Sequence, residues 1–256
     1  MWLVVRFLEE GQGGVELTQG QVIRLGRVKY LIKSLRAGPE PAETSGAETQ
    51  PSDDESVPEE ADKAEAVCRV CWEKETERSN PLISQCHCSG SIRFIHLDCM
   101  KRWLAGKVAV RSNDVTTSYS WKALECEVCK TLLPLTIRHR GKTVTLFDIA
   151  KPDCPHIILE AIESDKQVVK SAHVVTFEGG RTQVKLGRGH ESDVRINDIS
   201  VSRSHAVLNF ANNKFRLEDC KSKFGTLVRL AETVRLQGKV TVQLGRSLIA
   251  LEEKLS

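Results

Sequence analysis

Cysteine and histidine pairs are the residues of this sequence whose types and spacing could do chemistry. Four close pairs lie between residues 68 and 129: Cys68-x2-Cys71, Cys86-x-Cys88, His96-x2-Cys99 and Cys126-x2-Cys129. Thiolate and imidazole are ligands that zinc prefers, and eight of them are enough for two tetrahedral sites with four protein ligands each. Such a site leaves no open position for water, so we expect the metal to hold the fold and not to react. Because few apolar residues lie between the pairs, we expect this segment to fold only with metal bound.

The same cysteines could instead form disulfide bridges or pack in a core. The chain begins MWLVVRFLEE, which lacks the basic, apolar and small-residue regions of a secretory signal peptide. We therefore expect a soluble intracellular protein, cytoplasmic or nuclear, in which paired cysteines are more often metal ligands than bridges. The two leftover cysteines, Cys154 and Cys220, are expected to be small buried apolar residues.

The segment CRVCWEKETERSNPLISQCHCSGSIRFIHLDCMKRWL, followed by CEVCK, resembles a RING-CH domain, the RING variant found in some ubiquitin ligases. PHD fingers, which bind histone tails, share the ligand order. The spacing favours RING-CH, because only His87 separates Cys86 from Cys88 and seven residues separate Cys88 from His96. Leu124 also stands where a PHD finger usually has Trp.

The resemblance implies a cross-brace around two zinc ions, with His87 pointing to solvent. One ion would be held by Cys68, Cys71, His96 and Cys99, and the other by Cys86, Cys88, Cys126 and Cys129.

A RING domain docks a ubiquitin-conjugating enzyme and orients its ubiquitin thioester, so the resemblance implies a docking surface and no catalytic residue. By position, Val70 and Trp103 would contact the conjugating enzyme, and Lys130 would bridge the enzyme and ubiquitin. Val70 and Trp103 could instead pack the small core, and Lys130 could simply be solvated. The segment Ala105–Glu125 is long for this family, which predicts a disordered loop or a partner-specific insertion.

The segments around these pairs differ sharply in composition. Residues 1–36 alternate like β-strands, but two or three strands are marginal alone and must pack on the C-terminal domain or on a partner. Residues 37–66 hold ten acidic residues, one basic residue and four prolines, which predicts a disordered linker. The linker carries a net charge of −9 in a chain of +3, so the remainder carries +12 and favours acidic or phosphorylated partners. The basic residues are not accompanied by aromatic residues on which bases could stack, so we do not expect nucleic-acid binding. The sequence contains no run of eighteen apolar residues, so we expect no membrane-spanning helix.

From residue 156 onwards, short strands at regular spacing predict an all-β sandwich. The segments LGRGHESDVRINDISVSRSHAVL and DCKSKFGT resemble a forkhead-associated (FHA) domain, a sandwich that binds phosphothreonine peptides. The resemblance implies that Arg188 pairs with the phosphate and that Ser202 donates a hydrogen bond to it. It also implies that Arg203 and Lys223 flank the peptide and that His205 braces the loops.

One position departs from the FHA pattern. Phe224 stands where the family usually has an Asn that holds the peptide backbone, so the domain could also be one that has lost peptide binding. Separately, GQVIRLGR at residues 20–27 resembles GKVTVQLGR at residues 238–246. The N-terminal strands could therefore be a fragment of a second FHA-like unit or could complete one, and chance similarity between hairpins is the alternative.

The sequence therefore predicts a zinc-stabilised RING-CH domain and an all-β FHA-like sandwich, with N-terminal β-strands and an acidic linker. The predicted boundaries are N-terminal strands 1–36, linker 37–66, RING-CH domain 67–133, connector 134–155 and FHA domain 156–256. The leading function is a RING-CH ubiquitin ligase with two zinc ions, whose FHA domain recruits phosphothreonine proteins. The alternative is a non-catalytic zinc-binding scaffold in a large assembly, and a histone reader of PHD type ranks third.

Overall fold

The computed structural model of the chain describes residues 1–8, 14–38, 66–74, 77–162, 169–230 and 238–252. It divides into two compact units. The first unit combines Met1–Pro41, Val110–Ser120 and Lys151–Ser256, and the second combines Ala42–Ala109 with Trp121–Ala150. Nearly all of the predicted acidic linker lies outside the described residues.

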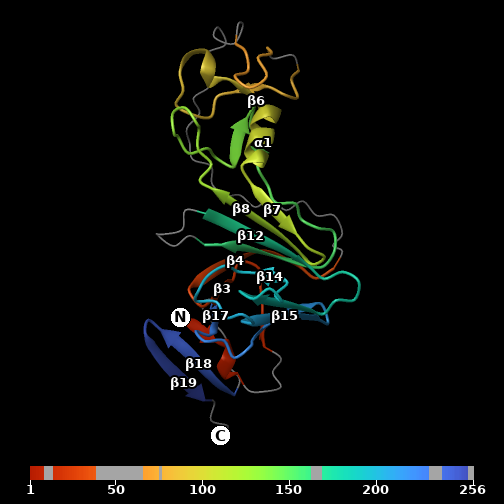
Figure 1. The fold of residues 1–256 in the computed structure, drawn as a ribbon, viewed down its shortest axis with the longest axis vertical. Helices are drawn as coiled ribbons and strands as arrows, with labels where there is room; N and C mark the ends of the chain where they lie inside the picture. Colours follow the sequence, from red (N-terminus) through yellow and green to blue (C-terminus); the bar gives the residue numbers. More distant parts are fainter. Residues whose placement is uncertain (9–13, 39–65, 75–76, 163–168, 231–237, 253–256) are drawn as a thin grey trace. The chain divides into compact units, whose positions relative to one another are not determined.

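The first unit is a sandwich of two β-sheets, as predicted (Figure 1). The larger sheet has the strand order β19-β18-β1-β17-β3-β4-β11-β12-β8-β7, and the smaller has the order β14-β13-β15-β16-β2. The strands of the larger sheet are β1 (Trp2–Val4), β3 (Val22–Leu25), β4 (Val28–Arg36), β7 (Ala109–Ser112), β8 (Thr116–Lys122), β11 (His156–Ala161), β12 (Val169–Thr176), β17 (Thr226–Arg229), β18 (Lys239–Leu244) and β19 (Ser247–Glu252). Those of the smaller sheet are β2 (Val15–Glu16), β13 (Gln183–Gly187), β14 (Val194–Arg195), β15 (Ala206–Ala211) and β16 (Lys214–Asp219).

The N-terminal strands lie in the middle of the larger sheet. β3 pairs with β17, and β4 pairs with β11, so residues from the start of the chain separate two C-terminal strands. Alternation explains the placement: Val28, Tyr30 and Ile32 of β4 are buried in the sandwich core, whereas Lys29 and Lys33 face solvent. A short 3-10 turn, η1 (Val5–Phe7), follows β1. The N-terminal strands therefore pack on the C-terminal strands, which was one of the two expected partners.

The long segment between the last two cysteine pairs also joins the sandwich. It forms the hairpin β7–β8, and β8 lies next to β12. Val115, at the turn, is buried in the sandwich core, and its carbonyl accepts a hydrogen bond of 2.9 Å from the Thr176 backbone N–H. The prediction of a disordered loop is wrong, because this hairpin pairs its backbone groups with a sheet that is distant in sequence. The predicted domain boundaries stay a prediction. The larger sheet nevertheless contains strands from the predicted N-terminal segment 1–36 and from the predicted RING-CH segment 67–133, together with strands of the predicted FHA segment.

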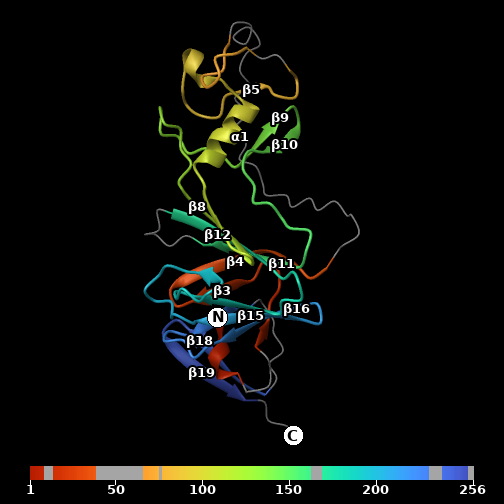
Figure 2. The same cartoon turned by 45° about the vertical axis from the view of Figure 1, so that its right-hand side comes forward.

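The second unit is built around one helix and short strands (Figure 2). Its elements are β5 (Leu82–Ile83), η3 (Gly90–Arg93), β6 (Ile95–His96), α1 (Leu97–Gly106), β9 (Thr136–His139) and β10 (Lys142–Thr145). Leu97, Met100 and Leu104 share one face of α1 at helical spacing, and all three are buried. Asp98 lies in the first turn, where a carboxylate interacts favourably with the helix dipole. The predicted connector contains the hairpin β9–β10.

Among the described residues, no helix combines the length and the apolar character needed to cross a membrane.

Candidate functional sites

The first metal centre gathers one ligand atom each from Cys68, Cys71, His96 and Cys99. These four atoms lie within 4.8 Å of one another. Cys68 and Cys71 come from a turn near the start of the unit, whereas His96 ends β6 and Cys99 lies in the first turn of α1. His96 Nδ1 lies 3.2 Å from Cys71 Sγ, so this nitrogen faces the thiols.

The second centre gathers Cys86, Cys88, Cys126 and Cys129, again within 4.8 Å. Zinc–sulfur bonds of about 2.3 Å at tetrahedral angles place two sulfurs about 3.8 Å apart. The Sγ atoms of Cys88 and Cys126 are 3.7 Å apart, which fits this geometry. The first donor set is three cysteines with one histidine, and the second is four cysteines. Both sets are typical of structural zinc, so the two centres fit the two predicted zinc ions.

Both Cys-x2-Cys turns have the same backbone. The N–H of Trp72 donates to the Cys68 carbonyl at 2.8 Å, and the N–H of Lys130 donates to the Cys126 carbonyl at 3.0 Å. Trp72 and Lys130 have positive φ angles of 64° and 60°, an uncommon conformation for residues with a side chain. The residue after each Cys pair is therefore turned outward in the same way.

Arg69 connects the two centres electrostatically. It lies between two ligands of the first centre, but its guanidinium donates to Cys126 Sγ of the second at 3.5 Å. The same nitrogen lies 3.9 Å from Cys88 Sγ and 4.0 Å from Cys86 Sγ. Burial opposes ionisation of Cys126, yet the backbone N–H groups of Cys129 and Val128, together with Arg69, lower the pKa of its thiol to about 6. This favours the thiolate, the form that binds metal.

The predicted docking residues occupy different environments in the second unit. The side chain of Val70 is 47% exposed, and Lys130 is exposed as well. Trp103 is half-buried on α1, with Lys107 Nζ 5.1 Å from the centre of its ring. Sequence reasoning missed Trp72, which is 77% exposed. Its position directly after a zinc ligand was the available signal, because the positive-φ turn carries that side chain outward.

In the first unit, two loops of the sandwich bring the predicted phosphopeptide residues together. The Arg188 N–H donates to the Ser202 carbonyl at 2.9 Å, and the Lys223 N–H donates to Ser202 Oγ at 3.0 Å. The Arg188 side chain donates through Nε to the Val201 carbonyl at 3.3 Å, and its terminal nitrogens have no hydrogen-bond partner among the described residues. Three of the four predicted residues, Arg188, Ser202 and Lys223, thus lie around one point.

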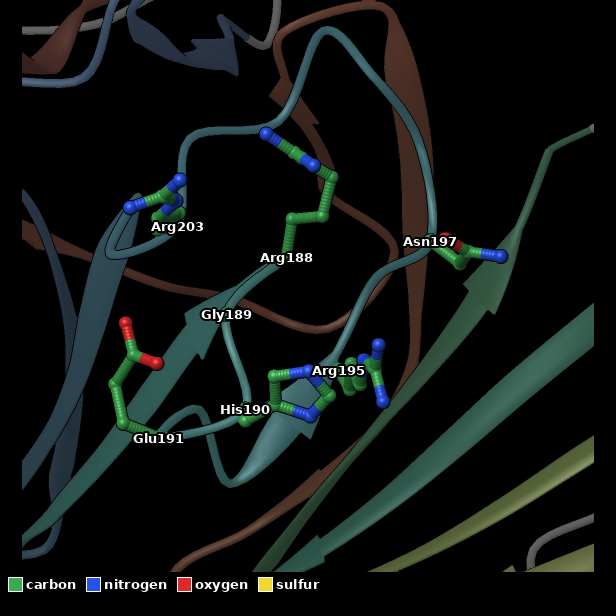
Figure 3. Close-up of a pocket in the computed structure, with 7 residues that line it drawn as sticks. All are labelled: Arg188, Gly189, His190, Glu191, Arg195, Asn197 and Arg203. Carbon is green, nitrogen blue, oxygen red and sulfur yellow. The ribbon is translucent and has the colours of Figure 1, made fainter.

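A pocket of about 380 Å³ opens beside this point (Figure 3). Arg188 and Arg203 line it, whereas Ser202 and Lys223 do not. Its other lining residues are Gly189, His190, Glu191, Arg195 and Asn197. Three arginines against one glutamate make this face of the sandwich positively charged, which suits an anionic ligand.

His205 braces the two loops, as predicted. It is fully buried, and its Nδ1 accepts a hydrogen bond of 2.9 Å from the Ser202 N–H. The opposite nitrogen, Nε2, therefore carries the proton and faces the Gly225 carbonyl at 3.3 Å. Burial lowers the pKa of His205, so the neutral form that this bonding pattern needs is favoured.

The N-terminal turn also supports these loops, which sequence reasoning missed. The Arg27 N–H donates to Ser200 Oγ at 2.9 Å, and the Gly26 N–H lies 3.4 Å from the Gly225 carbonyl. A Cβ at position 26 would lie 2.4 Å from the Ser200 carbonyl oxygen, so only glycine fits. Phe224, which replaces the usual Asn, is 55% exposed, and Lys223 Nζ lies 5.5 Å from the centre of its ring.

Comparisons with known proteins agree with both geometries. Residues 68–129 match the RING-variant domain, and residues 184–245 match the FHA domain. The chain carries both domains. The RING-variant match also sets the PHD alternative aside, and the eight ligands fall within it.

Several relatives share part of this sequence. The E3 ubiquitin-protein ligase MARCHF7 of Pongo abelii is 38% identical over 157 residues, which are 59% of this chain and 19% of that protein. MARCHF7 of Mus musculus is 40% identical over 88 residues, 34% of this chain and 10% of that protein. The probable E3 ubiquitin ligase SUD1 of Arabidopsis thaliana is 42% identical over 66 residues, 26% of this chain and 5% of that protein. The chain thus spans at most about a fifth of the length of these relatives. No solved structure gives a significant match.

Proposed function

We propose that the chain acts as a RING-type ubiquitin ligase whose zinc unit docks a ubiquitin-conjugating enzyme. The observation that carries this proposal is the pair of complete four-ligand centres, which leave Val70 exposed within the first Cys-x2-Cys turn and Lys130 exposed directly after the second. Zinc, when bound, supplies structure only, because four protein ligands leave no coordination position open. The relatives named as ligases support the proposal, although they match over a fraction of their length.

The chain's residues would act by binding and orienting the conjugating enzyme. Val70 offers exposed apolar surface, Trp72 adds a large aromatic beside it, and Trp103 presents part of its ring from α1. Exposed aromatic and aliphatic side chains grouped on a small rigid element are typical anchors of protein interfaces. Lys130 adds a positive charge at the second turn, where ubiquitin would be held. Catalysis would come from orientation of the thioester, with no proton transfer by this chain.

The test is discharge of ubiquitin from a panel of charged conjugating enzymes by the full chain and by Val70→Arg. We expect the wild type to accelerate discharge with at least one enzyme, and Val70→Arg to lose at least about tenfold of that acceleration, since a charge would be buried in the interface. Val110→Arg is the matched control, because Val110 is 53% exposed on β7 and outside the zinc unit's turns. Zinc content must stay at two ions in all three proteins. Wild-type protein with two zinc ions and no effect on any enzyme would contradict the proposal.

We also propose that the FHA domain recruits proteins that carry phosphothreonine. Arg188 and Arg203 line a positively charged pocket, and the Ser202 hydroxyl lies in a neighbouring loop that is hydrogen-bonded to the backbone of Arg188 and Lys223. A dianionic phosphate needs charged and hydrogen-bonding groups of this kind close together. Binding isotherms with phosphothreonine peptides test this. We expect Arg188→Ala to weaken binding at least about tenfold and Arg229→Ala, an exposed arginine at the far end of β17, to leave it unchanged. Equal binding by wild type and Arg188→Ala would end the idea.

Phe224 supports the second candidate, a scaffold that uses both domains for protein interaction without peptide binding. Its ring is more than half exposed at the position where the FHA pattern has a hydrogen-bonding Asn. If phosphothreonine peptides do not bind and Phe224→Asn creates binding, the scaffold function is the better account of the sandwich.

A further inference from the structure

Two hairpins of the sandwich share a sequence pattern and a turn. Leu25-Gly26-Arg27 joins β3 to β4, and Leu244-Gly245-Arg246 joins β18 to β19. In each hairpin the leucine pairs with the residue three positions later, so Gly and Arg form a two-residue turn. The two glycines have nearly equal φ angles, +62° and +59°. The hairpins are therefore alike in sequence, in register at the turn and in backbone conformation.

Their positions in the sheet differ. The first hairpin lies between β17 and β11 in the centre of the larger sheet, whereas the second lies at one end, where β18 pairs with β1 and β19 is the outermost strand. All six residues of β19 are exposed. An outermost strand with exposed apolar side chains is an unprotected edge, which natural sheets usually avoid.

Aligning the hairpins on their turns shows what the second one leaves unburied. Position 25 corresponds to 244, position 30 to 249, and position 32 to 251. In the first hairpin the exposed fractions at these positions are 0% for Leu25, 2% for Tyr30 and 0% for Ile32. In the second they are 46% for Leu244, 40% for Ile249 and 40% for Leu251. In the second hairpin, Val240 and Val242 of β18 are buried in a small cluster with Leu3, whereas the outer strand β19 leaves Ile249 and Leu251 partly exposed. The second hairpin is therefore packed on β1 along one strand only, and its remaining apolar side chains are less buried than those of the first.

The turn glycine gives the same contrast. Glycine is required at position 26, because the Ser200 carbonyl oxygen approaches to 2.4 Å of where a Cβ would be. At Gly245 a Cβ would meet nothing within 4 Å. The FHA match, moreover, runs from residue 184 through β18 to residue 245 and includes no part of β3 or β4. By sequence, strand β18 belongs to the FHA match, which ends at Gly245 just before β19, yet β3 of the first hairpin pairs with β17.

We propose that β18–β19 is an alternative closing hairpin, which exchanges with β3–β4 for the place between β17 and β11. Strand β18 follows β17 in the sequence, and consecutive strands are usually neighbours in a sheet, so β18 beside β17 is the ordinary arrangement. Exchange would bury Leu244, Ile249 and Leu251 while releasing Leu25, Tyr30 and Ile32, so the apolar areas of the two arrangements partly balance.

The exchange has a specific consequence for the loops of the phosphate site. Gly245 and Arg246 would take the places of Gly26 and Arg27 beside Ser200 and Gly225, so the loops would keep their support. Residues 1–36 would be released from the sheet and become accessible, held only through the chain that follows them. The proposal is independent of ligase activity and of phosphothreonine binding.

Amide hydrogen exchange on the full chain tests the proposal through a set of variants. Ile32→Ser weakens the first hairpin, and Leu251→Ser weakens the second. Leu248→Ser is the matched control, because position 248 corresponds to Lys29, which faces solvent in the first hairpin. Ile32→Val is a milder variant, because it removes one methylene only, and we expect it to fold.

We expect Ile32→Ser to slow exchange of the β18–β19 amides at least about tenfold and to speed exchange in β3–β4, while β13 and β15 stay protected. Ile32→Val should shift both hairpins in the same directions by a smaller factor. Adding Leu251→Ser to Ile32→Ser should abolish the new protection, whereas adding Leu248→Ser should not. Faster exchange throughout the sandwich in Ile32→Ser, or unchanged β18–β19 protection in both Ile32 variants, would overturn the proposal.

Discussion

The zinc unit and the sandwich reach their folds by different routes. In the zinc unit, each metal centre is defined by pairs of ligands two or three positions apart, and the two Cys-x2-Cys turns repeat one backbone geometry. In the sandwich, three distant segments of the chain, 1–41, 110–120 and 151–256, share two sheets. Local covalent spacing specifies the first unit, and long-range strand pairing specifies the second. The two units should therefore respond differently to loss of a ligand and to loss of core volume.

The largest effect should follow the removal of one zinc ligand. Cys126→Ser removes a buried thiol from the second centre, and the remaining ligands should lose that ion because structural zinc sites supply much of the folding free energy. We expect metal analysis to fall from two zinc ions to one or none, with amide protection lost in residues 66–109 and retained in β13, β15 and β16.

Cys154→Ser is the matched control, because Cys154 belongs to neither centre and should leave two zinc ions bound. Two ions in Cys126→Ser would contradict the ligand assignment. Loss of protection in β13 and β15 together with the zinc unit would contradict the contrast between the units.

A core substitution in the sandwich should give the opposite pattern. Phe215 is buried on β16, with its ring centre 5.3 Å from that of Phe177 and 4.6 Å from that of Phe210. Phe215→Ala should lower the free energy of unfolding of the sandwich by about 3–5 kcal/mol, because a cavity replaces an aromatic cluster. Denaturant unfolding measures this, and zinc content should stay at two ions. The exposed Phe7 provides the control, since Phe7→Ala should change stability by less than about 0.5 kcal/mol.

Acid should weaken the sandwich through His173. This side chain is buried on β12, with Nδ1 2.8 Å from Ser118 Oγ of β8 and Nε2 3.5 Å from the Tyr30 hydroxyl of β4. Burial lowers the pKa of His173 to about 4, from an ordinary value of 6.5. The unfolded chain therefore binds a proton that the folded sandwich excludes, and stability is lost as pH falls from about 6.5 towards 4, by up to about 3 kcal/mol.

The measurement is the free energy of unfolding of the sandwich as a function of pH, for wild type and for His173→Gln. Amide hydrogen exchange in β13 and β15 reports this free energy. The variant should lose the part of the slope between pH 6.5 and 4 that belongs to His173, while buried His156 and His205, whose pKa values are also lowered by burial, keep the rest. His190→Gln, at an exposed position, should keep the full slope. Parallel slopes in wild type and His173→Gln would show that this histidine makes no contribution to the acid sensitivity.

The gathering of the zinc ligands and the closeness of Arg188 to Ser202 were predictable because each of these residues lies in a short motif. The phosphate-binding role of Arg188 and Ser202 stays a prediction. Cys68 and Cys71 are three positions apart, so the short chain between them keeps their thiols close together. Arg188 and Ser202 both lie in the single segment LGRGHESDVRINDISVSRSHAVL, which resembles the FHA pattern. Alternation also predicted the strands at residues 22–36, because one face of each strand must be apolar wherever the sheet is packed.

Strand partners were not predictable in the same way. β17 could pair with any apolar strand of suitable length, and the two similar hairpins are equally good candidates by sequence. Residues 109–122 carry no strong pattern, since all four residues of β7 are exposed, so a loop was the natural expectation. Their place was decided by Val115 and by backbone groups that pair with strand β12, which no local signal records.

The smallest effect should come from the tip of that hairpin. Asn113 Oδ1 accepts hydrogen bonds from the N–H groups of Val115 at 2.9 Å and Thr116 at 2.7 Å, and its Nδ2 donates to the Asp193 carbonyl at 2.9 Å. Asn113→Ala should lower the free energy of unfolding of the sandwich by about 1–2 kcal/mol, since it removes side-chain bonds to partly buried backbone groups. Asp114→Ala, at the neighbouring exposed position, is the control and should change it by less than about 0.5 kcal/mol. Unchanged zinc content with reduced sandwich stability would show that a segment lying between two zinc-ligand pairs stabilises the other unit. Equal stability of the two variants would mean that the hairpin contributes to the sheet through Val115 and its backbone alone.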